Sequence, residues 1–462
     1  MGTILNPNQD NSFIRLFNAR NSNLFVDKTD FIRATNSFVN NPHSKFVAMS
    51  RGRGFGKSIM ADMLATYYSK GYAGRRIFQE LKIGQSGADG GGGRRTAPGG
   101  DSEPRQAAGA CAGPTRASGG DGLEYLNRFD VIYVDMHSIE ALYRDHMRYA
   151  DLIDGVDNIL DFMEYAIVRE LREDERFAPI LEKKRIGNSQ LFSALTALKE
   201  KTGVKFVLIM DDWDLIYRRC RDDLALQQKF TALLRGLFKS NAGYACFALA
   251  YLTGIMPIVK EASESGLNNV YDISMLQPRK YGRYFGFTEE EFDEIAASPS
   301  CREKFEKRNA GRCGYSYSRH IQDIKSWRDC YSVNGAHVYN PRSIVWALGD
   351  GNGKDWGRNC FGYEATRPLA MALPEVSEDI ARLLKGEKVA FCDMFFWTSL
   401  NSVRRRDDVF CLLTCLGYFS CDDGGSGQRI AYIPNPEMRE ALELLVEEAK
   451  RFRAESIEAK PS

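Results

Sequence analysis

The N-terminal part of the chain, residues 1–284, alternates between short apolar runs and longer amphipathic segments. A run that is apolar throughout is typical of a strand covered on both faces of a parallel sheet, and apolar residues at helical spacing are typical of the covering helices. The predicted strands are 45–50, 131–136, 205–210, 247–253 and 270–274, and the longer predicted helices are 152–171, 190–201 and 224–239. This alternation predicts an α/β domain with a mostly parallel sheet flanked by helices, assigned to residues 1–284.

A change of pattern after residue 284 predicts a second, mainly helical region at 285–452. The run TEEE predicts a helix start at Thr288, because threonine caps helix N-termini and acids favour the first turn. A further helix is predicted at 374–386, where Pro374 marks the start and Gly386 the stop.

The C-terminal end of this region predicts a helix followed by a β-hairpin, at about 411–435. This outline is compatible with a winged-helix-like unit. A last helix is expected from Pro436 to about Phe452, and the tail 453–462 is expected to be disordered.

One segment, 85–122, contains no Ile, Leu, Val, Met or aromatic residue. Such a segment cannot bury enough apolar surface to offset its loss of conformational entropy, so we predict a disordered low-complexity insert. An insertion of this kind costs little stability when its two ends lie close together.

The composition argues against several classes of protein. Lys and Arg number 62 and Asp and Glu 61, which gives a net charge of +1 and no overall preference for nucleic acid or membranes. We expect no signal peptide, and no apolar run reaches the roughly 18 residues that span a bilayer. The eleven cysteines form no Cys-x-x-Cys pair, and the five histidines form no metal-binding pattern. We expect an intracellular protein, cytoplasmic or nuclear, with free thiols, and no catalytic or metal role for the histidines.

The segment KFVAMSRGRGFGKS, residues 45–58, is a strand that leads into a glycine-rich loop and then into a helix. This is the context of a P-loop, or Walker A motif, whose backbone N–H groups and helix N-terminus bind phosphate oxygens. Lys57 would contact the terminal phosphates, and Ser58 would bind Mg²⁺. The first glycine of the pattern GxxxxGK[ST] is replaced by Arg51. The predicted nucleotide-binding residues are Gly52, Arg53, Gly54, Phe55, Gly56, Lys57, Ser58 and Ile59.

The strand KFVLIMDD, residues 205–212, ends in two aspartates and has the form of a Walker B motif. Asp211 would bind Mg²⁺, and Asp212 lies where ATPases of the additional-strand class have an acid that polarises the attacking water. Because Asp212 is one methylene shorter than the usual glutamate, slow hydrolysis is expected: a displacement of about 1 Å can cost a hundredfold in rate.

A third polar element is Thr253, at the end of the strand 247–253, where a sensor-1 group would contact the γ-phosphate or the water. An ordinary strand-terminal threonine is the alternative. No arginine finger is identified, although Arg235 and Lys239 on the preceding helix are candidates.

Several segments together resemble the AAA-ATPase-like family, a group of P-loop proteins often fused to a restriction-endonuclease-like nuclease domain. The resemblance rests on LFVDKTDFI, SRGRGFGKS, MDDWD, LTGIMPI, SGLNNVYDIS, FGFTEEE, WRDCY, VYNPRSI, LGYFS and IPNPEM. Arg51 stands where the family itself has arginine, whereas Gly52, Gly54, Asp212 and Cys330 depart from its pattern.

The resemblance implies an ATPase core followed by a helical lid region, with ATP and Mg²⁺ as ligands. The family's nuclease would follow IPNPEM, and the sequence continues for only one predicted helix and a short tail beyond that segment, so no nuclease activity is expected. The leading hypothesis is an ATPase that couples ATP binding and hydrolysis to movement of its C-terminal region. The alternatives are a nucleotide-binding interaction module with little or no turnover, and a regulatory ATPase associated with nucleic acid. A homo-oligomer or a protein partner is compatible with each.

Overall fold

The computed structural model describes most of the chain in fourteen stretches: residues 4–7, 10–20, 24–71, 75–85, 122–149, 155–188, 190–258, 267–310, 314–328, 330–333, 335–349, 363–394, 396 and 403–458. Residues 86–121 of the predicted insert, and 459–462 of the predicted tail, lie outside these stretches. The two edges of the insert are neighbours in space, since a Cβ built on Gly122 would lie 2.8 Å from Ile83 Cγ1.

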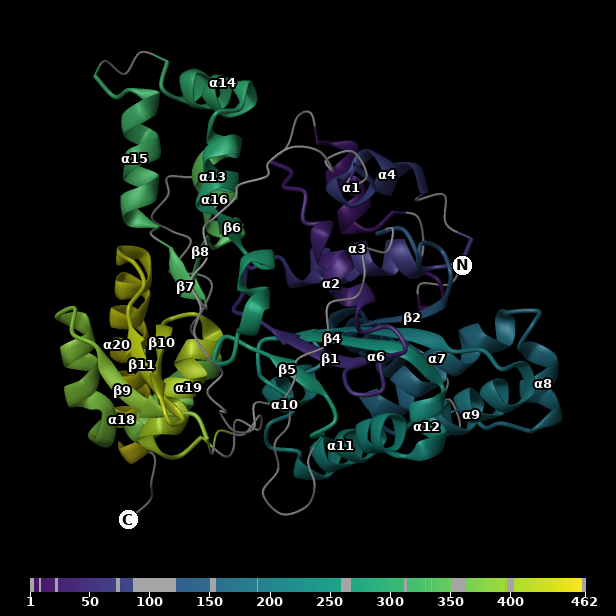
Figure 1. Cartoon of the computed structure of the whole chain (residues 1–462). Coiled ribbons are helices and arrows are strands. Elements are labelled where there is room, and N and C mark those ends of the chain that lie inside the picture. Colours follow the sequence, from purple (N-terminus) through teal and green to yellow (C-terminus); the bar gives the residue numbers. More distant parts are fainter. Residues whose placement is uncertain are drawn as a thin grey trace, which may run out of the picture.

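A five-stranded parallel sheet forms the centre of residues 1–284, with the strand order β2-β3-β4-β1-β5 (Figure 1). The strands are β1 (Phe46–Ser50), β2 (Asp130–Asp135), β3 (Phe206–Asp211), β4 (Phe247–Gly254) and β5 (Tyr271–Ile273). Every residue of β1, β3 and β4 is buried, as the apolar runs predict. Because β4 lies between β1 and β3, the P-loop strand and the strand that ends in Asp211 are separated by one additional strand.

Helices cover both faces of this sheet (Figure 1). One face carries α1 (Ser12–Asn18), α2 (Asp30–Asn36), α3 (Lys57–Tyr68), α4 (Arg75–Glu80) and α5 (Lys82–Gln85). The other carries α6 (Met136–Tyr149), α7 (Ile159–Glu173), α8 (Ala178–Lys183), α9 (Leu191–Thr202), α10 (Leu215–Arg219), α11 (Leu224–Lys239) and α12 (Asn241–Ala245).

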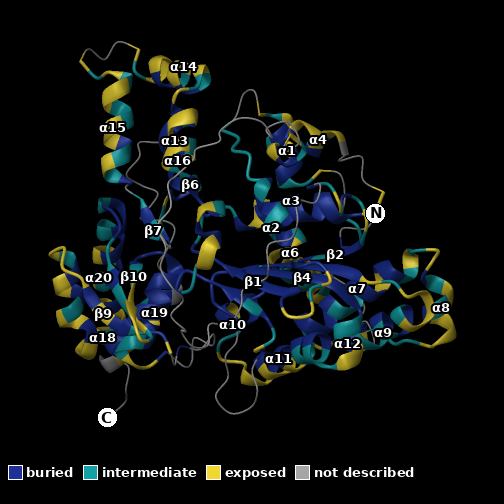
Figure 2. Ribbon diagram, in the orientation of Figure 1, coloured by how far each residue is buried: buried dark blue, intermediate teal, exposed yellow. Residues whose placement is uncertain are grey.

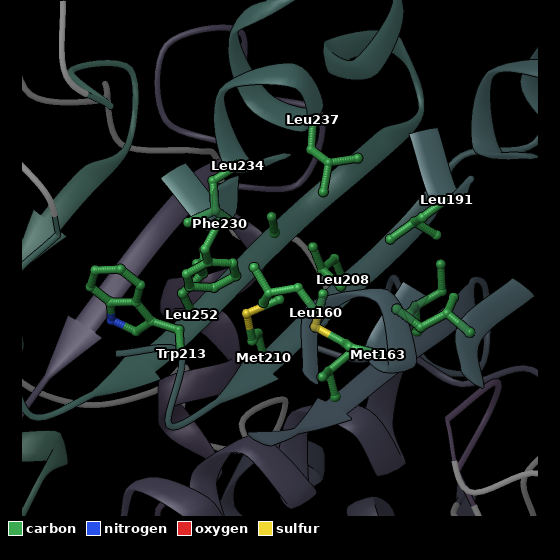
Figure 3. Close-up of a cluster of buried hydrophobic side chains, with 14 of the residues drawn as sticks. Leu160, Met163, Leu191, Leu208, Met210, Trp213, Phe230, Leu234, Leu237 and Leu252 are labelled. Atoms are coloured by element: carbon green, nitrogen blue, oxygen red, sulfur yellow. The ribbon is translucent and has the colours of Figure 1, made fainter. Parts of the chain in front are cut away.

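The core on the second face is built from β3, β4, α7, α9 and α11. Leu208 and Met210 of β3 point toward Leu160 and Met163 of α7, and Phe230 of α11 packs nearby (Figure 3). These side chains are at least nine-tenths buried. The sheet and its helices therefore form the α/β architecture that the sequence predicts.

The remaining residues form a mainly helical region that also contains two small antiparallel sheets, with the strand orders β6-β8-β7 and β10-β11-β9. Its elements are β6 (Phe287–Thr288), α13 (Glu289–Ala296), α14 (Pro299–Arg308), α15 (Tyr317–Trp327), β7 (Tyr331–Val333), β8 (Ala336–Tyr339), α16 (Pro341–Leu348), α18 (Tyr363–Leu384), β9 (Val389–Cys392), α19 (Arg406–Leu416), β10 (Ser420–Gly425), β11 (Gln428–Tyr432) and α20 (Pro436–Glu458). The short helix η1 (Arg279–Tyr284) precedes them, at the end of the sheet domain. The exposed residues gather on the outer helices, among them α14 and α15 (Figure 2).

The helix predicted at 374–386 begins earlier than expected, because α18 starts at Tyr363 and Pro374 lies inside it. A proline inside a helix leaves the carbonyl four residues earlier without its N–H donor. Arg453 Nη1 of α20 donates to that carbonyl, Ala370 O, at 3.1 Å. The same residue belongs to the last part of α20, which continues to Glu458 rather than ending near Phe452.

The predicted helix and β-hairpin near the C-terminus are present as α19, β10 and β11. Every residue of α19 from Asp408 to Leu416 is buried. A winged-helix protein places the corresponding helix in a nucleic acid groove, and α19 has no exposed face for this in the present arrangement.

Among the described helices, none combines the length and the apolar character that a membrane crossing requires. The eight cysteines in the described part of the chain are free thiols.

Candidate functional site

The glycine-rich loop follows β1 at the carboxyl edge of the sheet. Its first residue is tied to the neighbouring strand, since Arg51 N donates to Gly254 O at 3.0 Å. Gly54 and Gly56 have φ values of +82° and +83°, a region that favours glycine. α3 then begins at Lys57 without a side-chain cap, so its first N–H groups stay available to an anion. A Cβ built on Gly56 would meet nothing within 4 Å, which leaves open space beside the loop.

Arg51, which replaces the first glycine of the motif, is fully buried and does not line the loop's open side. Its Nη1 donates to Ser50 O at 2.8 Å and to Ile273 O at 3.3 Å, and its guanidinium lies over the Phe285 ring at 5.3 Å. Burial lowers the pKa of Arg51 to about 10. Because φ of Arg51 is not positive, the backbone here does not require glycine.

Lys57 is buried, and its Nζ donates to Gly52 O at 3.1 Å. Burial lowers its pKa, and the negative charges of Asp212, Asp211 and Asp214 oppose this shift. Ser58 and Ile59, the next two residues of α3, are exposed. The Lys57 ammonium is thus within electrostatic reach of the carboxylates at the end of β3.

Asp211 ends β3 and is buried beside the start of α3. Burial and then the charge of Asp212 raise the pKa of Asp211 to about 7, while the nearby Ser58 hydroxyl and the charge of Lys57 act in the opposite direction. Ser58 and Asp211, the two residues predicted to bind Mg²⁺, therefore lie close enough to interact. Both supply oxygen ligands, which Mg²⁺ prefers.

Asp212 has φ +52°, an uncommon value for a residue other than glycine, but one that aspartate tolerates better than most. Both of its carboxylate oxygens have cationic neighbours: Arg218 Nη2 lies 3.2 Å from Oδ1, and His137 Nε2 lies 3.1 Å from Oδ2. Burial alone would raise the pKa of Asp212, but the His137 hydrogen bond and the charges of Lys57 and Arg218 lower it far below its ordinary value.

Thr253 is fully buried in β4, between β1 and β3. Its hydroxyl donates to Met49 O of β1 at 3.0 Å. A hydrogen bond from this hydroxyl to a phosphate would therefore require the side chain to leave Met49. The sensor role of Thr253 stays a prediction.

The candidate arginine-finger residues, Arg235 and Lys239, lie toward the C-terminal end of α11. This end leads through α12 to the start of β4, and the Phe238 ring centroid lies 4.7 Å from that of Phe46, the first residue of β1. The last turn of α11 therefore lies at the amino edge of the sheet, opposite the P-loop.

His137, Arg218 and Asp214 belong to the site but were not predicted to. His137 follows β2, whose last residue pairs with Asp211, and this placement could have been inferred from the strand prediction alone. Arg218 Nε donates to Asp214 Oδ2 at 3.1 Å, and the same oxygen accepts from Ile255 N and Met256 N at 3.1 and 2.8 Å. Asp214 thereby fixes the segment after β4, next to the P-loop.

The Phe55 side chain points away from the open side of the loop. It is 2% exposed and belongs to the apolar core of the C-terminal region, where its ring meets that of Tyr331 at 5.1 Å. Of the loop residues predicted to bind nucleotide, Phe55 can thus contribute only its backbone N–H group.

A family model agrees with the resemblance seen in the sequence. The AAA-ATPase-like model, described as a predicted AAA-ATPase, matches residues 11–90, which include the P-loop. This match supports an ATP-binding protein of the AAA-ATPase-like class.

Two further comparisons add little. The crystal structure of Cdc6p from Pyrobaculum aerophilum is 12% identical, covers 92% of each chain and has a TM-score of 0.26. Similarity at this TM-score does not establish a shared fold, so the fold assignment rests on the strand order. No curated protein matches the sequence significantly.

Proposed function

We propose that this protein binds ATP together with Mg²⁺ at the carboxyl edge of the sheet and hydrolyses it slowly. The observation that carries the proposal is the interaction of the Ser58 hydroxyl with the Asp211 carboxyl, which lowers the pKa of Asp211. It joins the start of the helix after the P-loop to the end of β3, as a shared metal site requires. Lys57 lies in the same charge cluster.

The residues at this edge fit a divalent cation. Ser58 and Asp211 offer hydroxyl and carboxylate oxygens, and the raised pKa of Asp211 reflects burial of a carboxylate beside a second negative charge. When bound, Mg²⁺ would neutralise this charge and that of the phosphates.

The protein's own groups would divide the remaining work. The N–H groups of the loop and of the first turn of α3 would hold phosphate oxygens, and Lys57 would exchange its contact with Gly52 O for one with the terminal phosphates. Asp212 would polarise the attacking water. Its low pKa makes it a weak base, and its two oxygens already have partners, which supports slow turnover.

Point variants test the proposed roles separately. Lys57→Ala is expected to abolish ATP binding, while Asp212→Asn is expected to bind ATP and to lose turnover. Lys183→Ala, which changes an exposed lysine of α8, serves as the control for the loss of a positive charge. ATP hydrolysis by Asp212→Asn at the wild-type rate would show that Asp212 is not the base.

The engaged carboxylate of Asp212 also supports a second candidate, a nucleotide-binding module without real turnover. A binding titration and a radiolabelled ATP turnover assay separate the two. Tight binding without phosphate release, at several protein concentrations, would favour the module.

In both candidates, nucleotide binding would change the position or stability of the C-terminal region. This part of the proposal is supported by contacts between that region and the P-loop, which include the burial of Phe55.

A further inference from the structure

The C-terminal region contacts the backbone of the P-loop directly, at the N-terminus of α16. Asn340 Nδ2 donates to Arg53 O at 2.9 Å, and Arg342 N donates to Gly54 O at 3.3 Å. A Cβ built on Gly54 would come within 2.6 Å of Asn340 Oδ1, so the two segments are in close contact. Two successive carbonyl groups of the loop are thus bonded to residues far away in the sequence.

These two bonds set the direction of the N–H groups in the same peptide units. In a trans peptide the C=O of one residue and the N–H of the next point in opposite directions. The carbonyls of Arg53 and Gly54 face α16, so the N–H groups of Gly54 and Phe55 face away from it. That is the side of the loop on which phosphate would bind.

Asn340 is suited to this contact because its side chain serves two purposes at once. Its Oδ1 accepts from Arg342 N at 3.1 Å and from Ser343 N at 3.4 Å, and so caps α16. The cap fixes the amide group with Nδ2 toward the P-loop. Serine, threonine or aspartate could cap the helix, but only asparagine among the good capping residues also carries an N–H donor.

Two further contacts hold the loop against the same region. The Phe55 ring is buried in the C-terminal core beside Tyr331, whose hydroxyl donates to Gly417 O at 2.8 Å. A Cβ on Gly52 would lie 3.1 Å from Leu416 O, so the end of α19 also lies against the loop. A glycine-rich loop has many accessible conformations, and these contacts select one of them.

We propose that Asn340 is a positioning residue of the phosphate site, which orders the P-loop so that the N–H groups of Gly54 and Phe55 face the phosphates. It does so without contacting the nucleotide itself. This inference rests on the proposed function, because it requires that the P-loop binds a nucleoside phosphate. It also makes the C-terminal region a structural part of the nucleotide site.

The variant that tests the inference is Asn340→Ser, which keeps a helix-capping oxygen but loses the amide donor to Arg53 O. The matched control is Asn435→Ser. Asn435 also precedes a proline and caps a helix of the same region, with Oδ1 accepting from Met438 N at 2.8 Å. Melting temperatures without nucleotide show whether each variant folds, and Asn340→Thr replaces Asn340→Ser if the latter does not.

ADP and ATP affinities, measured with Mg²⁺, are expected to fall by about tenfold in Asn340→Ser, the effect of one lost hydrogen bond to the loop. Asn435→Ser is expected to bind like the wild type. Because the loss concerns ground-state phosphate binding, any ATPase activity should show a raised KM with kcat changed by less than about twofold. Affinities equal to the wild type in a folded Asn340→Ser would overturn the inference while leaving the proposed function intact.

A second measurement uses the reciprocity of coupling between sites. Hydrogen exchange of the wild-type protein is expected to slow in α16 and at the end of α19 when ADP and Mg²⁺ are added. In Asn340→Ser this protection should be lost in α16 at the same fraction of bound ADP. Equal protection of α16 in both proteins would contradict a coupling through Asn340. If the wild type binds neither ADP nor ATP, the proposed function itself fails.

Discussion

Asp211 and Asp212 are adjacent in the chain, but their surroundings shift their pKa values in opposite directions. Asp211 is buried near one hydroxyl and one ammonium group, and burial raises its pKa to about 7. Asp212 lies between His137 and Arg218, which lower its pKa despite its burial. At neutral pH and without metal, Asp212 is therefore ionised, whereas Asp211 is only partly ionised.

This difference predicts how Asp211→Asn changes stability with pH. A carboxyl whose folded pKa is raised stabilises the protein most below its unfolded pKa of about 4, and this contribution is lost as the pH rises through about 7. Without metal and nucleotide, Asp211→Asn should therefore gain stability relative to the wild type between pH 4 and 7. Chemical denaturation at several pH values measures this, with the exposed Asp222→Asn as control. If the free energies of unfolding of Asp211→Asn and the wild type differ by the same amount at every pH, the prediction is wrong.

His137 responds to pH in a different range. Its hydrogen bond with Asp212 raises its pKa, so its contribution to stability is present below the unfolded value of about 6.5 and is lost above the folded value. His137→Gln should thus destabilise the protein at pH 6 and have little effect at pH 9. Melting temperatures at the two pH values check this against His43→Gln, an exposed histidine. A larger effect at pH 9 would mean that the Asp212 contact does not stabilise charged His137.

At the scale of elements, local sequence determined the sheet far better than the C-terminal helices. Each strand end of the sheet lies within one residue of its predicted position, because strands buried on both faces are continuously apolar. The predicted start of α18 is wrong. Pro374 can lie inside the helix because Ala370 O, which has lost its helical N–H donor, accepts from another residue. That donor, Arg453, comes from α20 and cannot be recognised from the sequence around Pro374.

The same limit applies to the site. Lys57, Ser58 and Asp211 follow from motifs with fixed local spacing. Asn340 could not be assigned, because its contact with Arg53 joins segments 287 positions apart. His137 belongs to no sequence motif, but it follows a predicted strand whose end lies at the same edge of the sheet as Asp211.

The contact between α18 and α20 predicts a coupling between two substitutions. Arg453→Met leaves Ala370 O without a donor, which should cost about 1 kcal/mol of stability. Pro374→Ala restores an N–H that can donate to Ala370 O, so Arg453→Met should cost much less in that background. A double-mutant cycle by chemical denaturation measures the coupling. Additive effects of the two substitutions would show that Arg453 does not replace the missing helical bond.

At the scale of the whole molecule, the P-loop domain and the C-terminal region share one apolar core. Phe55, Ile255 and Met256, together with Met275 and Leu276, belong to the P-loop domain but are buried with α18, α19 and α20. The boundary near residue 284 that the sequence suggests therefore divides a core, whereas domains that fold alone have few contacts across their boundaries.

This shared core predicts that residues 1–284 do not form a stable nucleotide-binding domain on their own. The fragment would expose the apolar side chains that the C-terminal region covers, and exposed patches of this kind promote association. It would also lack Asn340 and the pocket for Phe55, so its P-loop would be less ordered.

We expect the fragment to aggregate or to melt at a lower temperature than the full chain, and to bind ADP more weakly. Light scattering, thermal unfolding and an ADP titration measure these properties. Co-expression with residues 285–458 should restore both properties, because it supplies the missing half of the core. A monodisperse fragment with the melting temperature and ADP affinity of the full chain would show that the C-terminal region is dispensable for the site.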